Sequence, residues 1–390
     1  MLQRPPTDDA GENYSAVRDR IATSYENVVL VLQGGGALGS YQPGVVEVLD
    51  EIGVHVNWVS GISIGAINSA IIAGNPPGRR VEMLKGFWEQ ITSRVEWPWI
   101  PSSHDARAKL NQLSSLTAMA LGQPGFFEPR FPPPYMVPPG GAEATSYYDT
   151  KPLKASLEQY VDFDYLNRGP VRLSVGAVNI RSGNFVYFDS TERRIRPEHI
   201  MASGALPPGF PAIEIDGELY WDGGLVSNTP LAYVLGKVDG AATLIFQVDL
   251  FSAAGAKPHS LPDVQERQKD IQFSSRTRLN TDVFRMIQAM RRDVRSLLDA
   301  LPPELHALPE VKKLESCRDA ALVNIIHLIY RRKMYDRDYK DYEFSRNTMV
   351  DHWKAGRDTI TRTLRHEDWF LPPSAEVGVT THDVHRDADD

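Results

Sequence analysis

The amino-acid sequence predicts an α/β fold with a mainly parallel β-sheet, and two observations lead to this prediction. First, Val28–Leu32 (VVLVL) is a continuous apolar run rich in β-branched residues, which is typical of a strand buried on both faces. Second, this run starts a β-α-β-α alternation that continues through a helix at GVVEVLDEI, a strand at His55–Ser60 and a helix at AINSAIIAG. Crossover connections in such an alternation make the strands parallel.

The chain after this alternation divides into regions of different composition. Residues 78–150 begin with one predicted helix and continue as an insertion rich in proline and aromatic residues, where proline disfavours interior helix and central strand. The sheet is expected to resume in the segments VRLSVGAVNI, FVYFDS, AIEIDG, ELYWDG and ATLIFQVDL. We therefore assign residues 27–261 to the main domain and residues 1–26 to a flexible lead.

Residues 262–371 are predicted to form a mostly helical C-terminal extension that packs on the main domain. Residues 263–301 contain neither proline nor glycine, as expected of one long helix or two stacked ones. Asn324–Tyr330 (NIIHLIY) is predicted to be one more buried strand, and a helix is expected from about Ser345. The polar residues 372–390 are predicted to be a disordered tail.

Composition and charge narrow the functional classes. A net charge of −8, from 42 basic and 50 acidic residues, is poorly suited to binding nucleic acid. No apolar run approaches the roughly 20 residues of a membrane span, and the polar N-terminus does not resemble a secretory signal. The single cysteine, Cys317, cannot form an internal disulfide. We expect a cytoplasmic protein without metal or cofactor, in which any contact with a membrane or lipid surface is peripheral, transient and apolar; its oligomeric state is left open.

A G-x-S-x-G motif, Gly61-Ile62-Ser63-Ile64-Gly65, lies between a predicted strand and a predicted helix. A serine in this position sits on a tight turn that projects its hydroxyl above the sheet, and flanking glycines avoid clashes there. The start of the following helix adds partial positive charge where an oxyanion develops. The alternative is a glycine turn whose serine only caps the helix.

Consecutive glycines occupy the turn after the first predicted strand. Gly34, Gly35 and Gly36, followed by Gly39, leave backbone N–H groups free to converge on a phosphate or a tetrahedral oxyanion. The segment also matches the G-x-G-x-x-G pattern, but a dinucleotide site needs an acidic residue about 20 positions further on. Residues 52–81 contain no Asp or Glu, which disfavours nucleotide binding. A purely structural glycine turn remains the other interpretation.

Asp222-Gly223-Gly224 follows the aromatic strand and is, by itself, a common turn. The order of the glycine loop, the serine motif and this D-G-G resembles that of the patatin-like phospholipases, over about residues 28–250. The resemblance implies a three-layer α/β/α sandwich in which residues 27–261 form the catalytic domain. The C-terminal extension resembles one attached to some bacterial members.

The resemblance also implies roles for individual residues. Ser63 corresponds to the nucleophile and Asp222 to the base of a Ser–Asp dyad. The oxyanion hole corresponds to Gly34, Gly35 and Gly36, and the supporting motif glycines are Gly39, Gly61, Gly65, Gly223 and Gly224. Leu38 is a departure, because the family often carries Arg or Lys at that position.

The three segments together supply what acyl transfer requires, namely a nucleophile, a proton acceptor and an oxyanion site. We predict a serine acyl hydrolase that cleaves carboxylic esters of lipids through an acyl-enzyme. Apolar neighbours such as Trp221 and Leu225 would raise the pKa of Asp222 and make it a better base. An acyltransferase using the same dyad is one alternative, and a non-catalytic nucleotide-binding or scaffold protein is another.

A Ser-His-Asp triad is the main mechanistic rival of the dyad. The histidines that could complete it are His259, His306, His327 and His352. His327 lies in an apolar run, where a core histidine with satisfied hydrogen bonds is the simpler interpretation. The loop and the serine motif also come too early in the chain for an α/β-hydrolase.

The aromatic residues of the insertion allow two interpretations. They either form a lid or lipid-facing surface, since Trp and Tyr favour the headgroup boundary, or they pack as cover over the sheet. The residues concerned are Phe87, Trp88, Trp97, Trp99, Phe126, Phe127, Phe131 and Tyr135.

Overall fold

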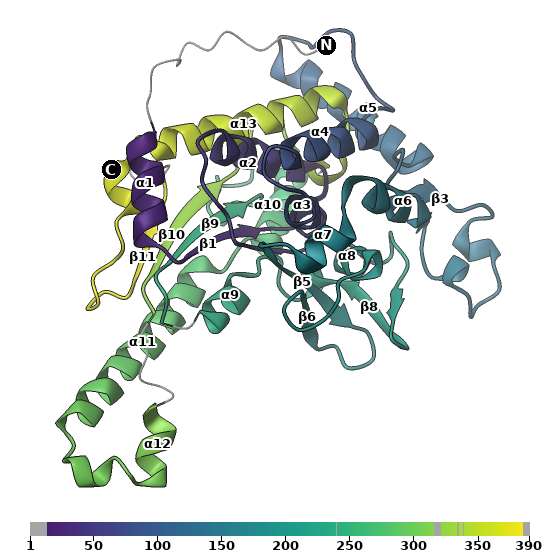
Figure 1. Ribbon diagram of the computed structural model, residues 1–390. Helices are drawn as coiled ribbons and strands as arrows, with labels where there is room; N and C mark the ends of the chain where they lie inside the picture. Colours follow the sequence, from purple (N-terminus) through teal and green to yellow (C-terminus); the bar gives the residue numbers. More distant parts are fainter. Residues whose placement is uncertain (1–13, 239, 316–320, 334, 338, 385–390) are drawn as a thin grey trace.

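The computed structural model describes residues 14–384 except 239, 316–320, 334 and 338, so Cys317 lies outside the described residues (Figure 1). A nine-stranded mixed sheet forms its centre, in the order β11-β10-β9-β1-β2-β5-β8-β7, with β6 paired to β5. The strands of this sheet are β1 (Asn27–Leu32), β2 (Trp58–Gly61), β5 (Arg172–Asn179), β6 (Phe185–Asp189), β7 (Ile213–Ile215), β8 (Glu218–Asp222), β9 (Thr243–Asp249), β10 (Val323–Ile329) and β11 (Val379–His382).

Helices flank this sheet on both sides, and a separate hairpin pairs β3 (Glu128–Pro129) with β4 (Tyr148–Asp149). The α-helices are α1 (Ser15–Ser24), α2 (Tyr41–Glu51), α3 (Ile64–Ala73), α4 (Arg80–Ile91), α5 (His104–Leu121), α6 (Lys151–Tyr160), α7 (Phe163–Arg168), α8 (Pro197–Ser203), α9 (Leu231–Lys237), α10 (Leu261–Phe273), α11 (Thr277–Ala300), α12 (Pro309–Glu315) and α13 (Arg346–Leu364). Short 3-10 helices at the site are η1 (Gly36–Ser40), η4 (Gly223–Leu225) and η6 (Lys340–Tyr342).

The strands from β11 to β5 run parallel, whereas β6, β7 and β8 pair antiparallel at the other side of the sheet. The parallel strands bring β1 and β2 side by side, with Leu32 opposite Gly61. Because both strands end at the same edge, the turns that follow them meet there. The prediction of a mainly parallel sheet is confirmed.

Alternate residues of β1 pack into two different cores, as expected of a strand between two helical layers. Leu30 and Leu32 belong to a large cluster with residues of α2, α3, α4 and α13. Val29 and Val31 face a smaller cluster with α9 and Phe284 of α11. Figure 1 shows the first group of helices on one side of the sheet and α9 and α11 on the other. The fold is therefore the expected three-layer sandwich.

Two predictions about the ends of the chain were wrong. Part of the predicted flexible lead forms α1, because Val17 and Ile21, one helical turn apart, are buried in the core. Part of the predicted disordered tail forms β11, because its backbone pairs with β10 and Val379 is buried. The rest of both predictions, over residues 1–13 and 385–390, falls outside the described residues.

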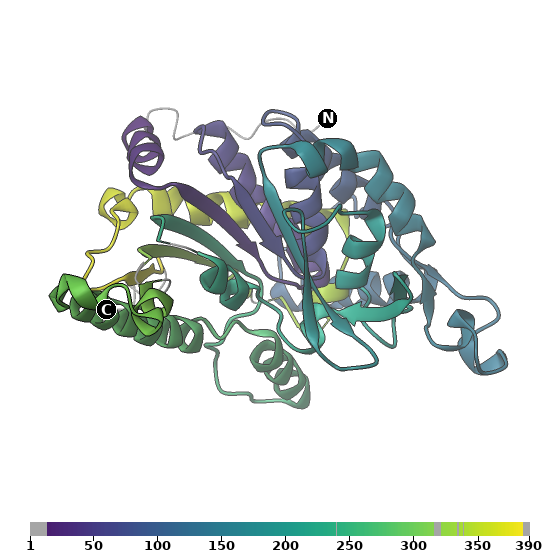
Figure 2. The same cartoon turned by 60° about the horizontal axis from the view of Figure 1, so that its bottom comes forward.

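The C-terminal region contributes to the sheet as well as covering it. β10 forms at the predicted apolar run, and of the two predicted possibilities, one long helix or two, the structure has two, α10 and α11. α13 packs on α2, while α11 and α12 extend outward from the body (Figures 1 and 2). Among the described residues, none of the helices combines the length and the apolarity that crossing a membrane would require.

Candidate active site

The turn after β1 approaches other backbone segments so closely that side chains cannot fit. Gly36 has φ of 55°, and a Cβ there would lie 2.0 Å from the carbonyl oxygen of Asp341. At Gly39 a Cβ would lie 2.5 Å from the side chain of Ile64, at the start of α3. The glycines therefore let the turn and η1 pack directly on the serine motif and on η6.

The serine motif is a strained strand-to-helix turn. Ser63 has φ of 55°, which is rare for a residue other than glycine, and α3 begins at the next residue. A Cβ at Gly61 would lie 2.3 Å from the carbonyl oxygen of Gly65, and one at Gly65 would lie 2.3 Å from that of Leu32. The backbone N–H of Ser63 donates to the carbonyl of Ser203 at 3.1 Å. These contacts hold Ser63 at the start of α3, where it lines a cavity.

Asp222 is buried at the end of β8, with 1% of its surface exposed, and it lines the same cavity as Ser63. The N–H of Gly224 donates to Asp222 Oδ1 at 2.7 Å. Burial raises the pKa of Asp222 to about 7, although the Gly224 N–H and the Ser63 hydroxyl act in the opposite direction. A Cβ at Gly223 would lie 2.7 Å from the carbonyl oxygen of Gly176, so this turn also depends on glycine.

The glycine loop lies beside this serine and has amide groups free for an anion. A Cβ at Gly34 would lie 3.0 Å from the Cβ of Ser63, and Gly35 and Gly36 line the same cavity as Ser63. The Gly34 N–H donates to the carbonyl of Asn228 at 3.1 Å. Within the described part of the chain, the N–H groups of Gly35 and Gly36 have no acceptor. The structure thus brings together the predicted loop, serine and aspartate.

Two further residues, which were not predicted from the sequence, hold the glycine loop. Asn228 Nδ2 donates to the carbonyls of Gly34 at 2.9 Å and of Phe273 at 3.1 Å. The buried Gln33 side chain accepts from the N–H groups of Leu250 and Phe251, at 2.6 and 2.9 Å, and also donates to the Phe273 carbonyl. Their roles depend on contacts with residues far away in the sequence, and no local pattern signals them.

An apolar cavity of about 440 Å³ opens beside Ser63 and Asp222. One wall comes from the insertion and the segment after α8, with Phe126, Phe127 and Phe210 in mutual ring contact. The C-terminal region supplies other parts of the wall, namely Phe273, Tyr342 and Phe344. Met119, Tyr147 and Leu206 line the cavity and are also exposed to solvent. The volume and lining suit an acyl chain.

None of the four candidate histidines lines this cavity. His327 Nε2 lies 2.6 Å from Asp249 Oδ2, and His352 Nδ1 lies 3.2 Å from the hydroxyl of Ser40. His306 Nε2 is 3.3 Å from a backbone carbonyl, and His259 lines a separate cavity. Burial lowers the pKa of His352. Among the residues that the structure describes, no histidine lines the cavity beside Ser63.

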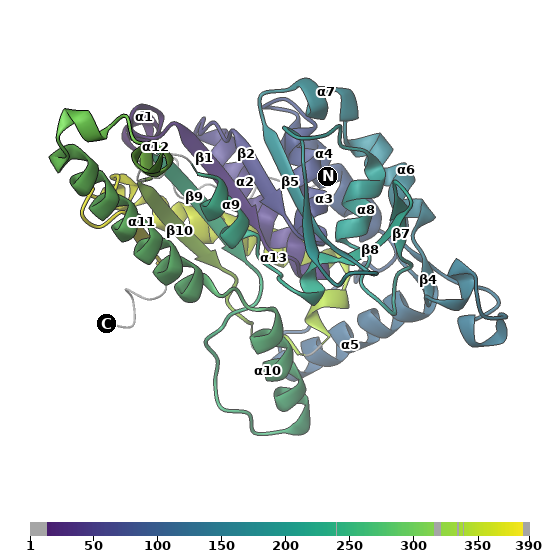
Figure 3. The same cartoon turned by 90° about the horizontal axis from the view of Figure 1, so that it is seen from below.

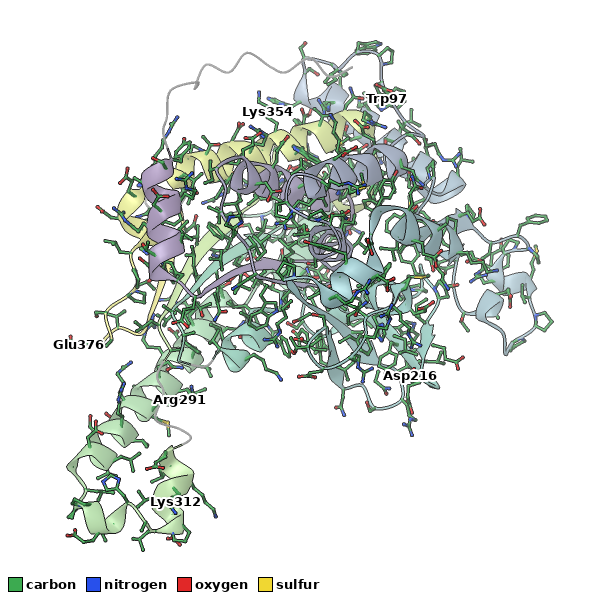
Figure 4. The ribbon with its side chains drawn as sticks, in the orientation of Figure 1. Trp97, Asp216, Arg291, Lys312, Lys354 and Glu376 are labelled. Atoms are coloured by element: carbon green, nitrogen blue, oxygen red, sulfur yellow. The ribbon has the colours of Figure 1, made fainter. Side chains whose placement is uncertain are left out.

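The aromatic residues of the insertion divide into three groups. Phe87 and Trp88 are in the core of the sandwich, as the cover interpretation expects, and Phe126 and Phe127 line the cavity. The exposed rings are Trp99, Phe131 and Tyr135. Trp97 belongs to none of these groups and lies at the outer edge of the molecule, where its backbone N–H donates to Asn347 Oδ1 at 3.0 Å (Figure 4). Neither Trp97 nor Trp99 borders the cavity.

Leu38, where the family often carries a basic residue, is fully buried in the large core cluster. Its side chain is therefore part of the packing beneath the loop and does not border the cavity.

Comparisons with known proteins support a single family. A model described as patatin-like phospholipase matches residues 30–235, and one described as patatin phospholipase matches residues 271–376. Patatin-like phospholipase domain-containing protein 7 of Rattus norvegicus is 36% identical over 97 residues, or 25% of this chain and 7% of that protein. Lysophospholipase NTE1 of Yarrowia lipolytica is 25% identical over 242 residues, or 62% of this chain and 14% of that protein.

The chain thus spans only a small part of the length of these curated relatives. Among solved structures, VipD from Legionella pneumophila aligns with 88% of this chain and 67% of its own, at 15% identity and a TM-score of 0.38.

Proposed function

Because this chain belongs to the patatin-like phospholipase family, whose model matches more than half of its residues, we propose that it is a serine hydrolase of lipid carboxylic esters. The observation that carries the proposal is that Ser63 and the buried Asp222 line one apolar cavity together with Gly35 and Gly36. A pKa of about 7 suits Asp222 to act as a general base near neutral pH.

In the first half-reaction, Ser63 Oγ attacks the ester carbonyl carbon while its proton passes to Asp222. The negative charge that develops on the carbonyl oxygen is stabilised by the N–H groups of Gly35 and Gly36 and by the start of α3. The bond to the alcohol oxygen then breaks, and the alcohol leaves with the proton from Asp222. The acyl group remains on Ser63 and its chain occupies the apolar cavity.

In the second half-reaction, water replaces the alcohol. Asp222 accepts a proton from the water as the water oxygen attacks the acyl carbonyl carbon. The same two N–H groups stabilise the second oxyanion. Collapse of that intermediate returns the proton to Ser63 Oγ and releases the carboxylic acid.

Lipid would reach this cavity from the surface where Met119, Tyr147 and Leu206 are exposed. An acidic protein gains no general attraction to anionic lipid, so its contact with a lipid surface must be local and apolar. These three side chains provide such a contact at the cavity itself. We place the protein in the cytoplasm, with transient contact to lipid at this rim.

The test compares wild type with Ser63→Ala on a panel of esters with different acyl lengths. We expect Ser63→Ala to lose hydrolysis while keeping its melting temperature, because the change removes the nucleophile and opens no cavity. Ser93→Ala, at an exposed serine, serves as the matched control. A phosphonate probe should label Ser63, and labelling of a different residue or turnover by Ser63→Ala would contradict the assignment.

Added alcohol acceptors separate hydrolysis from acyl transfer. A hydrolase yields mainly free acid, whereas an acyltransferase yields new ester in proportion to the acceptor. Absence of turnover on every ester, with a folded protein, would favour a non-catalytic scaffold or nucleotide-binding protein.

A further inference from the structure

A second cavity of about 420 Å³ lies next to the catalytic one and differs from it in character. The two cavities share walls, because Leu250 lines the second and Phe251 the first, while Lys340 lines the second and Asp341 the first. Residues of the loop before α10, of α10 and of the segment after β10 surround the second cavity. Figure 3 shows this loop running from β9 into α10 beside that helix.

The charged side chains that line the second cavity are mostly basic. Those that line it include five cations, namely Lys257, Arg267, Arg331, Arg332 and Lys340. The carboxylates are Asp263 and Asp270 in the lining and Glu266, which pairs with Arg332 and Lys340. Five cations against three carboxylates leave two positive charges, in a protein whose net charge is −8. A concave site of one sign concentrates ions of the opposite sign.

Two of these cations already form ion pairs within the protein. Lys340, which is 5% exposed, lies 2.6 Å from Asp270 Oδ1 and 3.4 Å from Glu266 Oε1. Arg332 lies 3.0 Å from the other oxygen of Glu266. This network fastens α10 to η6 and neutralises its own charges. It therefore builds the floor of the cavity without supplying the excess positive charge.

The excess charge comes from the other three cations. Arg267 donates to the backbone carbonyls of Ser252 and Ala253, which fix its guanidinium and leave its charge uncompensated. Lys257 and Arg331 have no acidic partner in the part of the chain that the structure describes. Thus three cations converge on one cavity, and Asp263 alone remains to offset them.

We propose that this cavity is a binding site for a phosphomonoester group, held by Lys257, Arg267 and Arg331. A phosphomonoester carries about −1.5 to −2 charges near pH 7, which matches the excess of the site. Guanidinium groups suit its oxygens because they donate in pairs, and Lys257 adds a point charge. The group can belong to a soluble metabolite or to the headgroup of a lipid.

The position of the site connects it to catalysis. Lys340 is part of its floor, and the carbonyl of the next residue, Asp341, lies against Gly36 of the oxyanion loop. An anion bound in this cavity would therefore lie close to Lys340, whose neighbour in the chain, Asp341, supports the glycine loop.

The experiment measures direct binding by the full-length wild type, with probes that are not carboxylic esters. Glycerol 3-phosphate tests the soluble source, by calorimetry at low salt. Vesicles of diether phosphatidylcholine, with or without diether phosphatidic acid, test the lipid source by co-sedimentation. Because neither probe is hydrolysed, the result does not depend on the proposed function of Ser63.

Replacing Lys257 and Arg331 together by glutamine should weaken binding by roughly tenfold or more, because charge-assisted hydrogen bonds are among the strongest single contacts. Lys354→Gln, on α13 and remote from the cavity (Figure 4), is the matched control and should bind like wild type. A third variant, Arg267→Lys, keeps the charge but loses the paired donors, and should bind with intermediate affinity. Equal melting temperatures would show that these variants are folded.

The outcomes separate the two sources and the failure of the proposal. Binding of glycerol 3-phosphate that depends on Lys257 and Arg331 supports a soluble ligand, and binding that appears only on vesicles with phosphatidic acid supports a headgroup. If wild type binds neither probe, or the double variant binds as tightly as Lys354→Gln, the site does not exist.

Discussion

Two regions of the chain build the proposed catalytic cavity by different means. Residues 34–228 supply Ser63, Asp222 and the glycine loop, to which we assign the chemistry, from three turns in which glycine is required by close backbone contacts. Residues 273–344 supply apolar walls and backbone carbonyls from segments without any short motif. Chemistry is therefore encoded locally in the first region, whereas substrate fit is encoded by tertiary packing in the second. Substitutions in the first region should change the rate of hydrolysis, and those in the second region should change the preference for acyl chains of different length.

The largest effect is expected from Asp222→Asn. We expect kcat/KM to fall by about 10²–10⁴-fold, because the amide cannot accept the proton of Ser63. Alanine substitutions at His259, His306, His327 and His352 should leave most of the activity, since none of these residues borders the cavity. A folded histidine variant that is as inactive as Asp222→Asn would favour a Ser-His-Asp triad over the dyad.

The pH dependence of the wild type should be the next largest effect. Asp222 must be ionised to act as a base, so kcat/KM should rise with pH through about 7 and be roughly 100-fold lower at pH 5 than at the plateau. The stability of the folded protein should change with pH in the opposite direction. The folded pKa lies above the unfolded value of about 3.9, so this group lowers the free energy of unfolding as pH rises from 4 through 7. The Asp222→Asn variant should not lose stability in this way, so its melting temperature at pH 8 should be at least that of wild type. A lower melting temperature of the variant at pH 8 would contradict this expectation.

Asn228→Ala tests the junction of the two regions, because this side chain binds the carbonyls of both Gly34 and Phe273. We expect kcat to fall about tenfold with KM nearly unchanged, since the oxyanion loop loses one of its fixed hydrogen bonds. Asn347→Ala is the control, because Asn347 makes a similar pair of contacts to the backbone of Trp97 away from the site. Equal losses in the two variants would mean that only general stability is affected.

The smallest effect is expected from Phe344→Leu in the C-terminal region. The smaller side chain enlarges the cavity, and each additional buried methylene is worth about 0.8 kcal/mol, or roughly fourfold in kcat/KM. The preference should shift toward longer acyl chains, with little change in turnover of a short ester. Phe370→Leu, a core substitution that does not border the cavity, should show no such shift. An equal loss of kcat/KM on esters of all acyl lengths would contradict the proposed difference between the two regions.

Sequence reasoning predicted those parts of the molecule in which a local pattern and its structural cause coincide. The apolar run at β1 predicts a doubly buried strand, and the glycines at 34–36, 61 and 65 predict turns that only glycine can form. The same reasoning missed α5, because its buried side carries mostly small or polar residues such as Asn111 and Ser115 instead of an apolar stripe. It also missed the strand β11, whose four residues gain their stability from pairing with β10.

The candidate site was predictable to a similar extent. Ser63 and Asp222 could be named from motifs, and both residues line the same cavity in the structure. The raised pKa of Asp222 depends on burial by residues from several elements, so the sequence could suggest its direction but not its size. Gln33, Asn228 and the second, basic cavity follow only from the way the C-terminal region folds back over the loop.

The neighbouring strands β1, β9, β10 and β11 lie in the sheet in the order in which a ribosome would make them. Each of these strands pairs with the one before it in this series. Residues 250–322 separate β9 from β10, and their synthesis at about 5–20 residues per second would take roughly 4–15 s. During that interval the nascent chain offers the unpaired edge of β9, an apolar strand, to other chains. The demand on cellular chaperones should therefore peak while the α10–α12 segment is being translated.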